Sequence, residues 1–498
     1  MSKMTPDSSK SIPTFYAGQS ILLTGATGFM GKVFIEKVLR TCSDVREIFL
    51  VIRPKKGLSV NQRLEKILHL PLYERLRNER PFSFQKLIPI SGDATEKGFG
   101  LSASDRQMLI ERVTIIVHGS ASVRFNNTLQ FAIFTNTRAT RDICILAQNM
   151  KNLLAVVHIS TAFAHVNESI VEEKVYPSIA DWRKMITIAE SLDEHTLNIF
   201  TAKCLEYAPN TYIFTKNLSE RIILDYSSSL PCAIIRPSSV SPSIKEPMPG
   251  WIDNLYGPIG LYVGGGKGIV RIGHCKKSTT ENNVPVDAVI NAILVTTWKL
   301  GLTSPTADST VFVLNFSSQK SFSFKNSMNI LSSIIKETPF EKTLWVPNTI
   351  LTDNLLIFYV LTILLHILPA IIFDSVLYVS GRRPMLLKLM RRLYVANRAV
   401  SYFSFHERKF DHENRLNLLN SISPNDLEEF SFDYTSSDIR EYCRHCVIGA
   451  KQFILHEDMN RLDIAHAHRK RIYLFATIFE TTILIGLLWI IYKYMYSL

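Results

Sequence analysis

A chain of 498 residues is too long for one ordinary domain, and its 46% hydrophobic and 20% charged residues argue against a disordered protein. The formal net charge of +12 favours anionic partners such as nucleotides, phosphorylated carriers or an acidic membrane face, and no DNA- or RNA-reading motif is present. The seven scattered cysteines indicate reduced thiols, and Cys443 and Cys446 have no second pair at zinc spacing, so no metal site is predicted.

Short apolar runs alternate with helix-like segments through roughly the first 240 residues. The runs occupy residues 20–24, 47–53, 87–93, 113–120, 153–161 and 231–238. Nearly continuous apolar runs are typical of strands covered on both faces, and their alternation with helices predicts a parallel sheet. We therefore expect a Rossmann-like, doubly wound α/β fold. Residues 240–340 are richer in Pro and Gly and are expected to form loops and a smaller cap rather than more of the sheet.

The first apolar run leads into "TGATGFMG", which spaces three glycines three residues apart before an apolar-periodic helix. Glycines in such a turn let the backbone approach a pyrophosphate, and the helix N-terminus supplies free N–H groups and partial positive charge. This context predicts a dinucleotide-binding loop rather than a glycine-rich turn without a ligand. The residues assigned to the loop are Thr24, Gly25, Thr27, Gly28, Phe29 and Gly31.

The end of the second apolar run indicates which dinucleotide binds. An NAD site usually carries an Asp or Glu there, which binds the ribose 2′-hydroxyl. This chain instead reads "VIRPKKG", with Arg53, Lys55 and Lys56 and no acidic residue. Arg and Lys suit a 2′-phosphate, so Arg53 and Lys55 are predicted to select NADP(H). The alternative is a solvated basic turn.

A candidate proton donor lies in "TYIFTK", where Tyr212 precedes Lys216 by four residues. On a helix this spacing places both side chains on one face. A nearby ammonium stabilises a phenolate, so the pKa of Tyr212 is expected to fall below its usual value of about 10, which makes the phenol a usable acid near neutral pH. The pair alone is a weak signal, because a chain with 18 tyrosines contains such spacing by chance.

Further polar residues end two of the predicted strands. "HISTAF" places Ser160 and Thr161 at a carboxyl strand end, and His118 ends the run before it. Ligands bind at this edge of open α/β sheets. We interpret His118 as a structural or cofactor-contacting group in preference to a general acid.

The order of glycine loop, Ser/Thr at a strand end and Tyr-x-x-x-Lys resembles the extended short-chain dehydrogenase/reductase family, over roughly residues 18–290. The resemblance implies a catalytic group of Tyr212, Lys216 and one hydroxyl of the Ser160/Thr161 pair, with Thr161 favoured. It also implies that Asp93, in "SGD", contacts the adenine of the cofactor.

Longer motifs narrow the resemblance. "TGATGFMGKVFIEKVLR", "VHGSASVRFN", "HISTAFAH", "YIFTKNLSE" and "FDHENRLNLLNSISPNDLEEFSFDY" together are similar to the alcohol-forming fatty acyl-CoA reductases, including their helical, male-sterility-type C-terminal domain. The resemblance extends to about residue 456. It implies that NADPH reduces a long-chain acyl-CoA to a primary alcohol and CoA through a bound aldehyde. The alternatives are an extended family member that acts on a steroid or sugar nucleotide, and an inactive, membrane-anchored nucleotide-binding protein.

Two apolar segments suggest membrane attachment. Residues 472–492 have the length of a membrane span, and the basic tetrapeptide "HRKR" at 468–471 precedes them, which places the catalytic part on the cytosolic side. Residues 355–379 are nearly as long, but Pro369 and Asp374 interrupt them and basic residues follow. We expect this second segment to form a hairpin or to lie in the interface without crossing. A buried terminal helix is the alternative for residues 472–492.

These observations divide the chain into five parts. Long-chain acyl-CoA and membrane lipid are the expected partners, and the endoplasmic reticulum is favoured over the peroxisome. The predicted parts are an NADP-binding reductase domain with a cap at 15–290, a connecting segment at 291–354, the apolar segment at 355–379, a helical domain at 380–460 and a transmembrane helix at 472–492.

Overall fold

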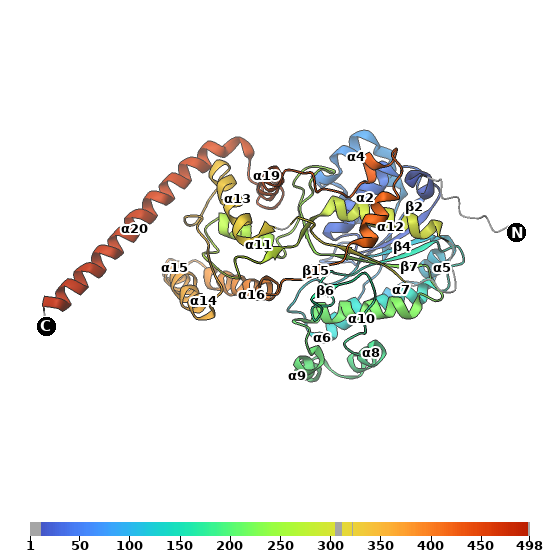
Figure 1. The fold of residues 1–498 in the computed structure, drawn as a ribbon, viewed down its shortest axis with the longest axis horizontal. Helices are drawn as coiled ribbons and strands as arrows, with labels where there is room; N and C mark the ends of the chain where they lie inside the picture. Colours follow the sequence, from blue (N-terminus) through green and yellow to red (C-terminus); the bar gives the residue numbers. More distant parts are fainter. Residues whose placement is uncertain (1–10, 304–310, 321, 497–498) are drawn as a thin grey trace. The chain divides into compact units, whose positions relative to one another are not determined.

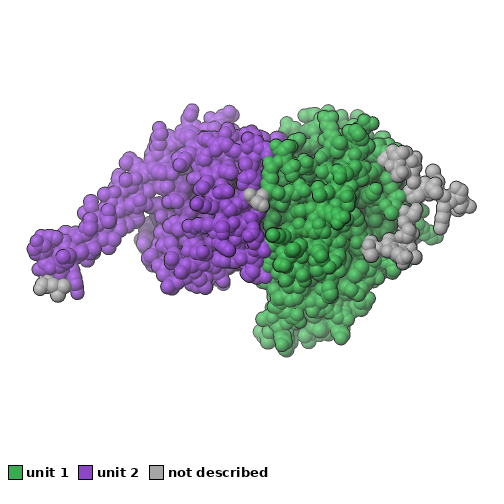
Figure 2. All heavy atoms as spheres, viewed as in Figure 1, with its two compact units in different colours: residues 1–248, 282–320, 408–436 green, residues 249–281, 321–407, 437–498 purple. Residues whose placement is uncertain are grey.

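The computed structural model describes residues 11–303, 311–320 and 322–496. The chain forms two compact units, coloured separately in Figure 2. The sheet unit comprises residues 1–248, 282–320 and 408–436, and the helical unit comprises 249–281, 321–407 and 437–498. Each unit is therefore assembled from three separate stretches of chain. The predicted five-part division follows chain order, and it stays a prediction.

A seven-stranded parallel sheet forms the core of the sheet unit. Its strand order is β12-β7-β5-β4-β1-β2-β3, and every pairing is parallel. The predicted Rossmann-like, doubly wound sheet is confirmed, and all six predicted runs contribute a strand to it. The strands are β1 (Ser20–Thr24), β2 (Glu47–Ile52), β3 (Leu87–Ser91), β4 (Ile115–His118), β5 (Ala155–Ile159), β7 (Cys232–Pro237) and β12 (Phe312–Phe316).

The seventh strand corrects one expectation. β12 lies within residues 240–340, which were expected to add nothing to the sheet, yet it pairs with β7 from Phe312 opposite Ala233 to Phe316 opposite Pro237. Val313, Leu314 and Phe316 are fully buried. The expectation was wrong because five apolar-rich residues, "FVLNF", stand between polar tracts that dominate the composition of the region.

Helices cover both faces of the sheet. α2 (Phe29–Thr41) packs against α12 (Val286–Leu302) on one face, and α7 (Ala139–Ala147) packs against α10 (Thr211–Tyr226) on the other (Figure 1). This double cover explains why the strands are apolar at nearly every position rather than alternately.

The strand order reverses between β1 and β4. From β1 the chain proceeds to β2 and β3 on one side, and from β4 it proceeds to β5, β7 and β12 on the other. In open α/β sheets the connections diverge at such a switch point and leave a crevice at the carboxyl ends of the strands. Thr24 of β1 pairs with His118 of β4, which pairs with His158 of β5, so these three strands end close to one level.

The remaining elements of the sheet unit are short. Two small parallel pairs join distant segments, namely β6 (Ile170–Val171) with β15 (Lys409–Phe410), and β8 (Ser239–Ser241) with β11 (Asn283–Pro285). The other helices are α1 (Ile12–Tyr16), α3 (Val60–Leu68), α4 (Glu74–Glu79), α5 (Ala103–Arg112), α6 (Leu129–Ala132), α8 (Trp182–Ser191), α9 (Glu194–Leu205), α17 (Glu413–Asn420) and α18 (Leu427–Phe430).

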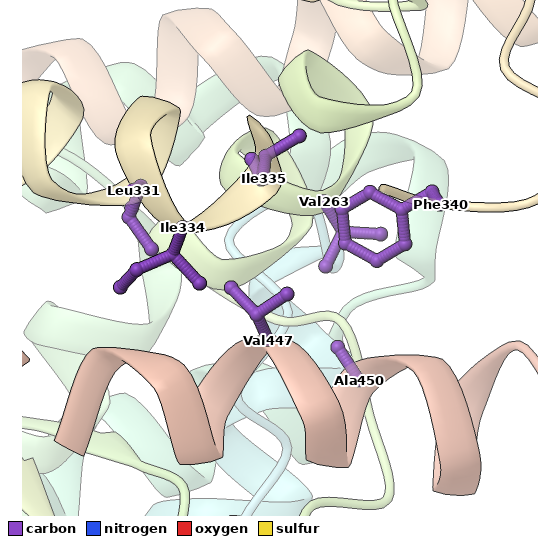
Figure 3. Packing of buried hydrophobic residues seen from close by; sticks show 7 residues of the cluster. All are labelled: Val263, Leu331, Ile334, Ile335, Phe340, Val447 and Ala450. Atoms are coloured by element: carbon purple, nitrogen blue, oxygen red, sulfur yellow. The ribbon is translucent and has the colours of Figure 1, made fainter. Parts of the chain in front are cut away.

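The helical unit has a hydrophobic core of its own, shown in Figure 3. The core joins α11 (Pro258–Gly266), α13 (Phe324–Glu337) and α19 (Ile439–Gly449). Two small strand pairs complete the unit, β9 (Ile272–His274) with β14 (Ile350–Thr352) and β10 (Thr280–Glu281) with β13 (Phe322–Ser323). The buried core residues are Val263, Leu331, Ile334, Ile335, Phe340, Val447 and Ala450.

Residues 355–379 form one helical run and not a hairpin. α14 (Leu355–Thr362) continues through a π-helical segment, Ile363–Ile367, into α15 (Leu368–Val379). The expected hairpin is therefore wrong for this segment. Pro369 lies in the first turn after the π segment, where a wider helix accommodates a residue that lacks an N–H group.

The acidic residue in this run also has a structural partner. Asp374 accepts hydrogen bonds of 2.9 Å from the backbone N–H groups of Met385, Leu386 and Leu387. These groups begin α16 (Leu386–Phe405), which packs back along α15. Asp374 thus caps the N-terminus of α16. This role explains why an acidic residue lies in an apolar run, because its hydrogen bonds stabilise the turn between α15 and α16.

The C-terminal helix α20 (Leu462–Tyr496) is continuous over the predicted span. Its first part is attached to the helical unit, because His468 Nε2 lies 2.9 Å from the Thr343 carbonyl oxygen and the Trp345 ring packs edge-on against Phe475 and Phe479. Met459–Tyr496 and Leu355–Val379 are both long and apolar enough to cross a membrane. Only 6% of the apolar window in the first is buried, compared with 22% in the second.

Candidate functional site

The three predicted glycines line the β1–α2 turn, and steric limits explain two of them directly. Gly25 has φ of +82°, and a Cβ atom there would lie 2.8 Å from the backbone carbonyl of Gly119. A Cβ atom on Gly31 would lie 2.4 Å from the Gly25 carbonyl oxygen. The turn therefore closes tightly on β4 and on the first turn of α2, which leaves room for a ligand to approach the backbone.

The start of α2 is arranged for an anion. Its N-cap residue is Gly28, which has no side chain to bind the first N–H groups of the helix, and Phe29 is the first helical residue. The Thr27 carbonyl accepts a hydrogen bond of 3.2 Å from Lys32 Nζ, which adds positive charge beside the turn. Free N–H groups and a nearby ammonium fit the pyrophosphate of a dinucleotide.

Thr24 and His118 form a buried polar connection beneath the glycine turn. Thr24 Oγ1 accepts from the Ser120 N–H at 3.1 Å and lies 2.7 Å from His118 Nδ1. Thr140 Oγ1 donates to the Asn136 carbonyl oxygen, so it accepts from His118 Nε2 at 3.1 Å, and Nδ1 of the neutral ring accepts from Thr24. Burial lowers the pKa of His118 to about 3, with the charge of Lys216 as a smaller cause, so the imidazole is neutral and structural.

The predicted nucleotide-selecting residues meet at the ends of β2 and β3. Arg53 Nη1 lies 3.2 Å from Asp93 Oδ2, and Asp93 Oδ1 accepts from the Thr95 N–H at 3.0 Å. The Arg53 side chain is 44% exposed, and Lys55 and Lys56 are also exposed. The structure thus brings Arg53 and Asp93 together at the same edge of the sheet as the glycine turn.

Tyr212 lies in the first turn of α10, where Asn210 fixes its position. The Asn210 side chain caps the helix by accepting from the Ile213 N–H at 2.9 Å. Burial raises the pKa of Tyr212 to about 12, and a side-chain hydrogen bond with Thr161 opposes this rise. The expected lowering of the pKa by Lys216 is therefore wrong, because burial raises the pKa by more than the Thr161 hydrogen bond lowers it. The phenol keeps its proton at neutral pH, as a proton donor requires.

Lys216 is buried one turn further along α10. Its Nζ donates to the Ile159 carbonyl oxygen at 2.6 Å, at the end of β5. Burial lowers the pKa of Lys216 to about 7, while the negative charge of Glu220 opposes the shift. The Glu220 charge therefore favours the ammonium form of Lys216 against the effect of burial.

The two hydroxyls of the "HISTAF" motif take different partners. Ser160 Oγ donates to the carboxylate of Glu220 at 2.6 Å, whereas Thr161 is hydrogen-bonded to Tyr212. Of the two candidates, Thr161 is thus the one joined to the proton donor, and Ser160 is bound to a buried ion pair behind it.

Three residues of this region were not identified from the sequence. Gly119 provides the backbone against which the glycine turn closes. Asn136, in a π-helical segment (Ile133–Arg138), accepts from the Ser122 N–H at 2.8 Å and donates to Thr215 Oγ1 at 2.9 Å, which ties α10 to the loop after β4. Glu220 follows Lys216 by four residues, a spacing that was available in the sequence but carried no chemical signal by itself.

The arrangement permits proton donation beside a dinucleotide. A protonated phenol with a hydroxyl partner and a buried lysine lies at the carboxyl end of β5, and a glycine turn suited to phosphate lies at the end of β1. Such donors stabilise an oxyanion on a carbonyl substrate. Among the residues that the structure describes, no group of three or more His, Cys, Asp or Glu side chains could hold a metal ion.

Family models and curated relatives match most of this chain. Two family models, both described as male sterility protein, match residues 23–293 and 365–457. Fatty acyl-CoA reductase 1 of Homo sapiens is 37% identical over 482 residues, which cover 97% of this chain and 93% of that protein. Fatty acyl-CoA reductase wat of Drosophila melanogaster is 33% identical over 450 residues, which cover 90% of this chain and 86% of that protein.

Solved structures share the fold at lower identity. The terminal R domain of the myxalamid PKS-NRPS pathway superimposes with a TM-score of 0.58 and 18% identity, covering 89% of this chain and 93% of that one. The reductase domain of a nonribosomal peptide synthetase from Mycobacterium tuberculosis gives a TM-score of 0.57 and 16% identity, with 88% and 92% covered. These likenesses support the architecture of the chain.

Proposed function

Because the chain belongs to the fatty acyl-CoA reductase family, we propose that it reduces long-chain acyl-CoA to a primary fatty alcohol and free CoA, with NADPH as the reductant. The observation that carries the proposal is the grouping of Thr161, Tyr212 and Lys216 at the carboxyl end of β5, with the glycine turn at the neighbouring edge. The C-terminal part of the chain supports the same function, because the second family model matches residues 365–457. A steroid or sugar-nucleotide reductase has no need of such a C-terminal part.

The cofactor is assigned to residues that fit its parts. The glycine turn and the N-terminus of α2 receive the pyrophosphate, Asp93 faces the adenine side, and the half-exposed Arg53 with Lys55 selects the 2′-phosphate. When bound, NADPH supplies hydride. Lys216, Tyr212 and His118 complete the cofactor-binding set, with the neutral His118 supporting the turn through Thr24.

Thr161 and Tyr212 act on the carbonyl oxygen of the thioester. Reduction at the carbonyl carbon places negative charge on this oxygen, and each hydroxyl that hydrogen-bonds to the charge is worth about 3–4 kcal/mol. The carbonyl then re-forms as the carbon–sulfur bond breaks, and the CoA thiolate leaves with that electron pair. The product of this stage is an aldehyde that stays bound.

The aldehyde stage needs a full proton transfer. Two hydride equivalents and two protons in total convert the thioester to an alcohol and a thiol, and Tyr212 gives its proton to the alkoxide oxygen. The phenolate that remains is stabilised by the Lys216 ammonium four residues away on the same helix face. A phenol that is protonated at neutral pH is suited to this role.

Product analysis with one matched pair of variants tests the function. Purified full-length protein with NADPH and palmitoyl-CoA is expected to release free thiol and hexadecanol, measured by a thiol reagent and by gas chromatography. Tyr212→Phe removes the proton donor and is expected to lower kcat by about 10²–10⁴-fold, with NADPH binding retained. Tyr226→Phe, at the far end of the same helix, is the control and keeps full activity. Full turnover by Tyr212→Phe would contradict the assignment.

We further propose that α20 crosses a membrane with the catalytic part on the cytosolic side, and that residues 355–379 lie in the interface. The low burial of α20 and the basic residues 468–471 before its apolar part support this topology. A chain that ends after Lys470 is expected to lose most of its retention in the membrane pellet. Unchanged retention would move the attachment to residues 355–379. Co-localisation with organelle markers tests the proposed endoplasmic reticulum against the peroxisome.

A further inference from the structure

Glu220 lies on the same face of α10 as the proposed proton donor and its lysine. It follows Lys216 by four residues and Tyr212 by eight, and helical neighbours four apart stack on one side. Its side chain is completely buried inside the sheet unit. A carboxylate at such a site costs several kcal/mol unless its oxygens are fully hydrogen-bonded, so its partners indicate why it is retained.

Four donors surround the two carboxylate oxygens. Arg236, on β7, binds both of them, with Nε 2.9 Å from Oε1 and Nη2 2.7 Å from Oε2. His165 Nε2 lies 2.8 Å from Oε2, and Ser160 Oγ donates to Oε1 at 2.6 Å. Burial opposes ionisation of Glu220, but Arg236 and His165 outweigh it and hold the pKa of the carboxyl far below its usual range. The Glu220 carboxylate therefore stays ionised, with the Arg236 guanidinium as its counter-ion.

This charge is connected to the catalytic groups by two routes. The first is covalent, because Ser160, held by Glu220, is adjacent to Thr161, which is hydrogen-bonded to Tyr212. The second is electrostatic, because Glu220 opposes the loss of the Lys216 proton that burial favours. Ser160 is further fixed by a backbone hydrogen bond of 2.7 Å to the Ile235 carbonyl oxygen, beside Arg236 on β7.

Among the described residues, Glu220 is the carboxylate that opposes the effect of burial on Lys216. Lys216 also interacts electrostatically with His118 on β4 and His158 on β5, and Tyr212 precedes it by four residues on α10. Both histidines are fully buried, and burial together with the Lys216 charge lowers their pKa values, so they are neutral. On the far side of Glu220 stand Arg236 and His165, whose ring packs 4.7 Å from that of Tyr176.

We propose that Glu220 is a positioning residue for the reduction, which fixes the Thr161 hydroxyl against Tyr212 through Ser160 and supplies the negative charge that keeps Lys216 in its ammonium form. This assignment rests on the proposed reductase function. In this assignment Ser160 does not contact the reacting atoms and acts through Thr161. The Tyr-x-x-x-Lys pair is extended by Glu220, four residues further along α10, and Glu220 forms the ion pair with Arg236.

The test separates the charge from the positioning. Glu220→Gln keeps the side-chain shape but removes the charge, so Lys216 loses its proton at lower pH. We expect kcat to fall at least tenfold and the alkaline limb of its pH profile to move about one unit toward acid. Ser160→Ala removes the hydroxyl that donates to Glu220 but leaves the Glu220 charge in place, and it is expected to lower kcat about fivefold without moving that limb. Glu111→Gln, an exposed glutamate on α5, is the control and changes neither.

Two results would overturn the proposal. One is an alkaline limb in Glu220→Gln that coincides with that of the unmodified chain, since a purely structural role alters stability and not the pH profile. The other is an unchanged kcat in Ser160→Ala. This second result would overturn the proposal even if Glu220→Gln does not fold. Fluorescence titration of NADPH binding against pH reports the same Lys216 shift without substrate. A chain that does not reduce acyl-CoA yet shows the shift would refute the proposed function and leave the role of Glu220 standing.

Discussion

The proposed site has two ends, the β1–α2 turn and the β5–α10 corner, and they differ in whether backbone or side chains form them. At the β1–α2 turn the backbone forms the site, and Gly25 and Gly31 are required because no extra carbon atom fits. At the β5–α10 corner, buried side chains form it, and Lys216, Glu220 and Arg236 depend on partners within hydrogen-bond distance. A substitution that adds atoms disrupts the β1–α2 turn by steric overlap. A substitution that removes atoms disrupts the β5–α10 corner, because a buried polar group loses its partner.

The largest effect is expected at the backbone end. Gly25→Ala introduces a Cβ atom 2.8 Å from Gly119 at a backbone φ of +82°, so the turn must open and the pyrophosphate site is distorted. We expect NADPH affinity, measured by fluorescence titration, to fall more than about 100-fold, which equals the loss of roughly 3 kcal/mol.

Gly18→Ala is the matched control for this prediction. Gly18 also has a positive φ, of +73°, but an added Cβ atom there meets nothing within 4 Å. The control is therefore expected to cost about 1 kcal/mol of stability with no change in NADPH affinity. Equal affinity losses in both variants would show that backbone strain, and not the close approach of the turn to β4, governs binding.

A somewhat smaller effect is expected at the side-chain end. Thr161→Val keeps the shape of the side chain but removes the hydroxyl bonded to Tyr212. Loss of one oxyanion donor typically lowers kcat about 10²-fold, and we expect that decrease with KM for acyl-CoA nearly unchanged. Thr187→Val, on the exposed side of α8, is the control. A Thr161→Val enzyme with full kcat would remove the hydroxyl from the proposed mechanism.

The smallest effect is expected at the nucleotide-selecting residue after β2, on the side of β1 away from β5. Arg53→Ala removes a half-exposed guanidinium next to Asp93. We expect the preference for NADPH over NADH, measured as the ratio of kcat/KM values, to fall about 10-fold, since a charged hydrogen bond contributes roughly 1.5 kcal/mol or more. Arg46→Ala, an exposed arginine just before β2, leaves the ratio unchanged. An unaltered ratio in Arg53→Ala would assign selection to Lys55 or Lys56.

Sequence patterns predicted the backbone end well because its determinants are local. The strand "SILLT", the spacing of Gly25, Gly28 and Gly31, and the start of α2 all lie within residues 20–31. Helical spacing also places Tyr212 and Lys216 together, but this spacing was a weak signal until the hydroxyls at a strand end gave it context. The architecture of the sheet also followed from runs that each encode one strand.

The side-chain end was only partly predictable because its partners come from distant parts of the chain. Arg236 lies on β7 and His165 follows β5, and nothing in either local sequence marks them as partners of Glu220. The predicted direction of the Tyr212 pKa shift was wrong for the same reason, because the degree of burial of a side chain depends on the whole fold. Strand β12 was missed because a five-residue run carries little signal outside its sheet.

The interleaving of the sheet unit has a consequence for biosynthesis. Residues 408–436 belong to this unit, where Arg415 donates to the Ser317 carbonyl at 2.7 Å and Asn414 donates to the Val313 carbonyl at 2.8 Å, both in or just after the edge strand β12. The ribosome therefore translates the glycine turn some four hundred residues before the last piece that completes its own unit. All seven strands of the sheet are translated once β12 is made, but the sheet unit stays incomplete until residues 408–436 follow, so premature termination before about residue 436 leaves this unit incomplete.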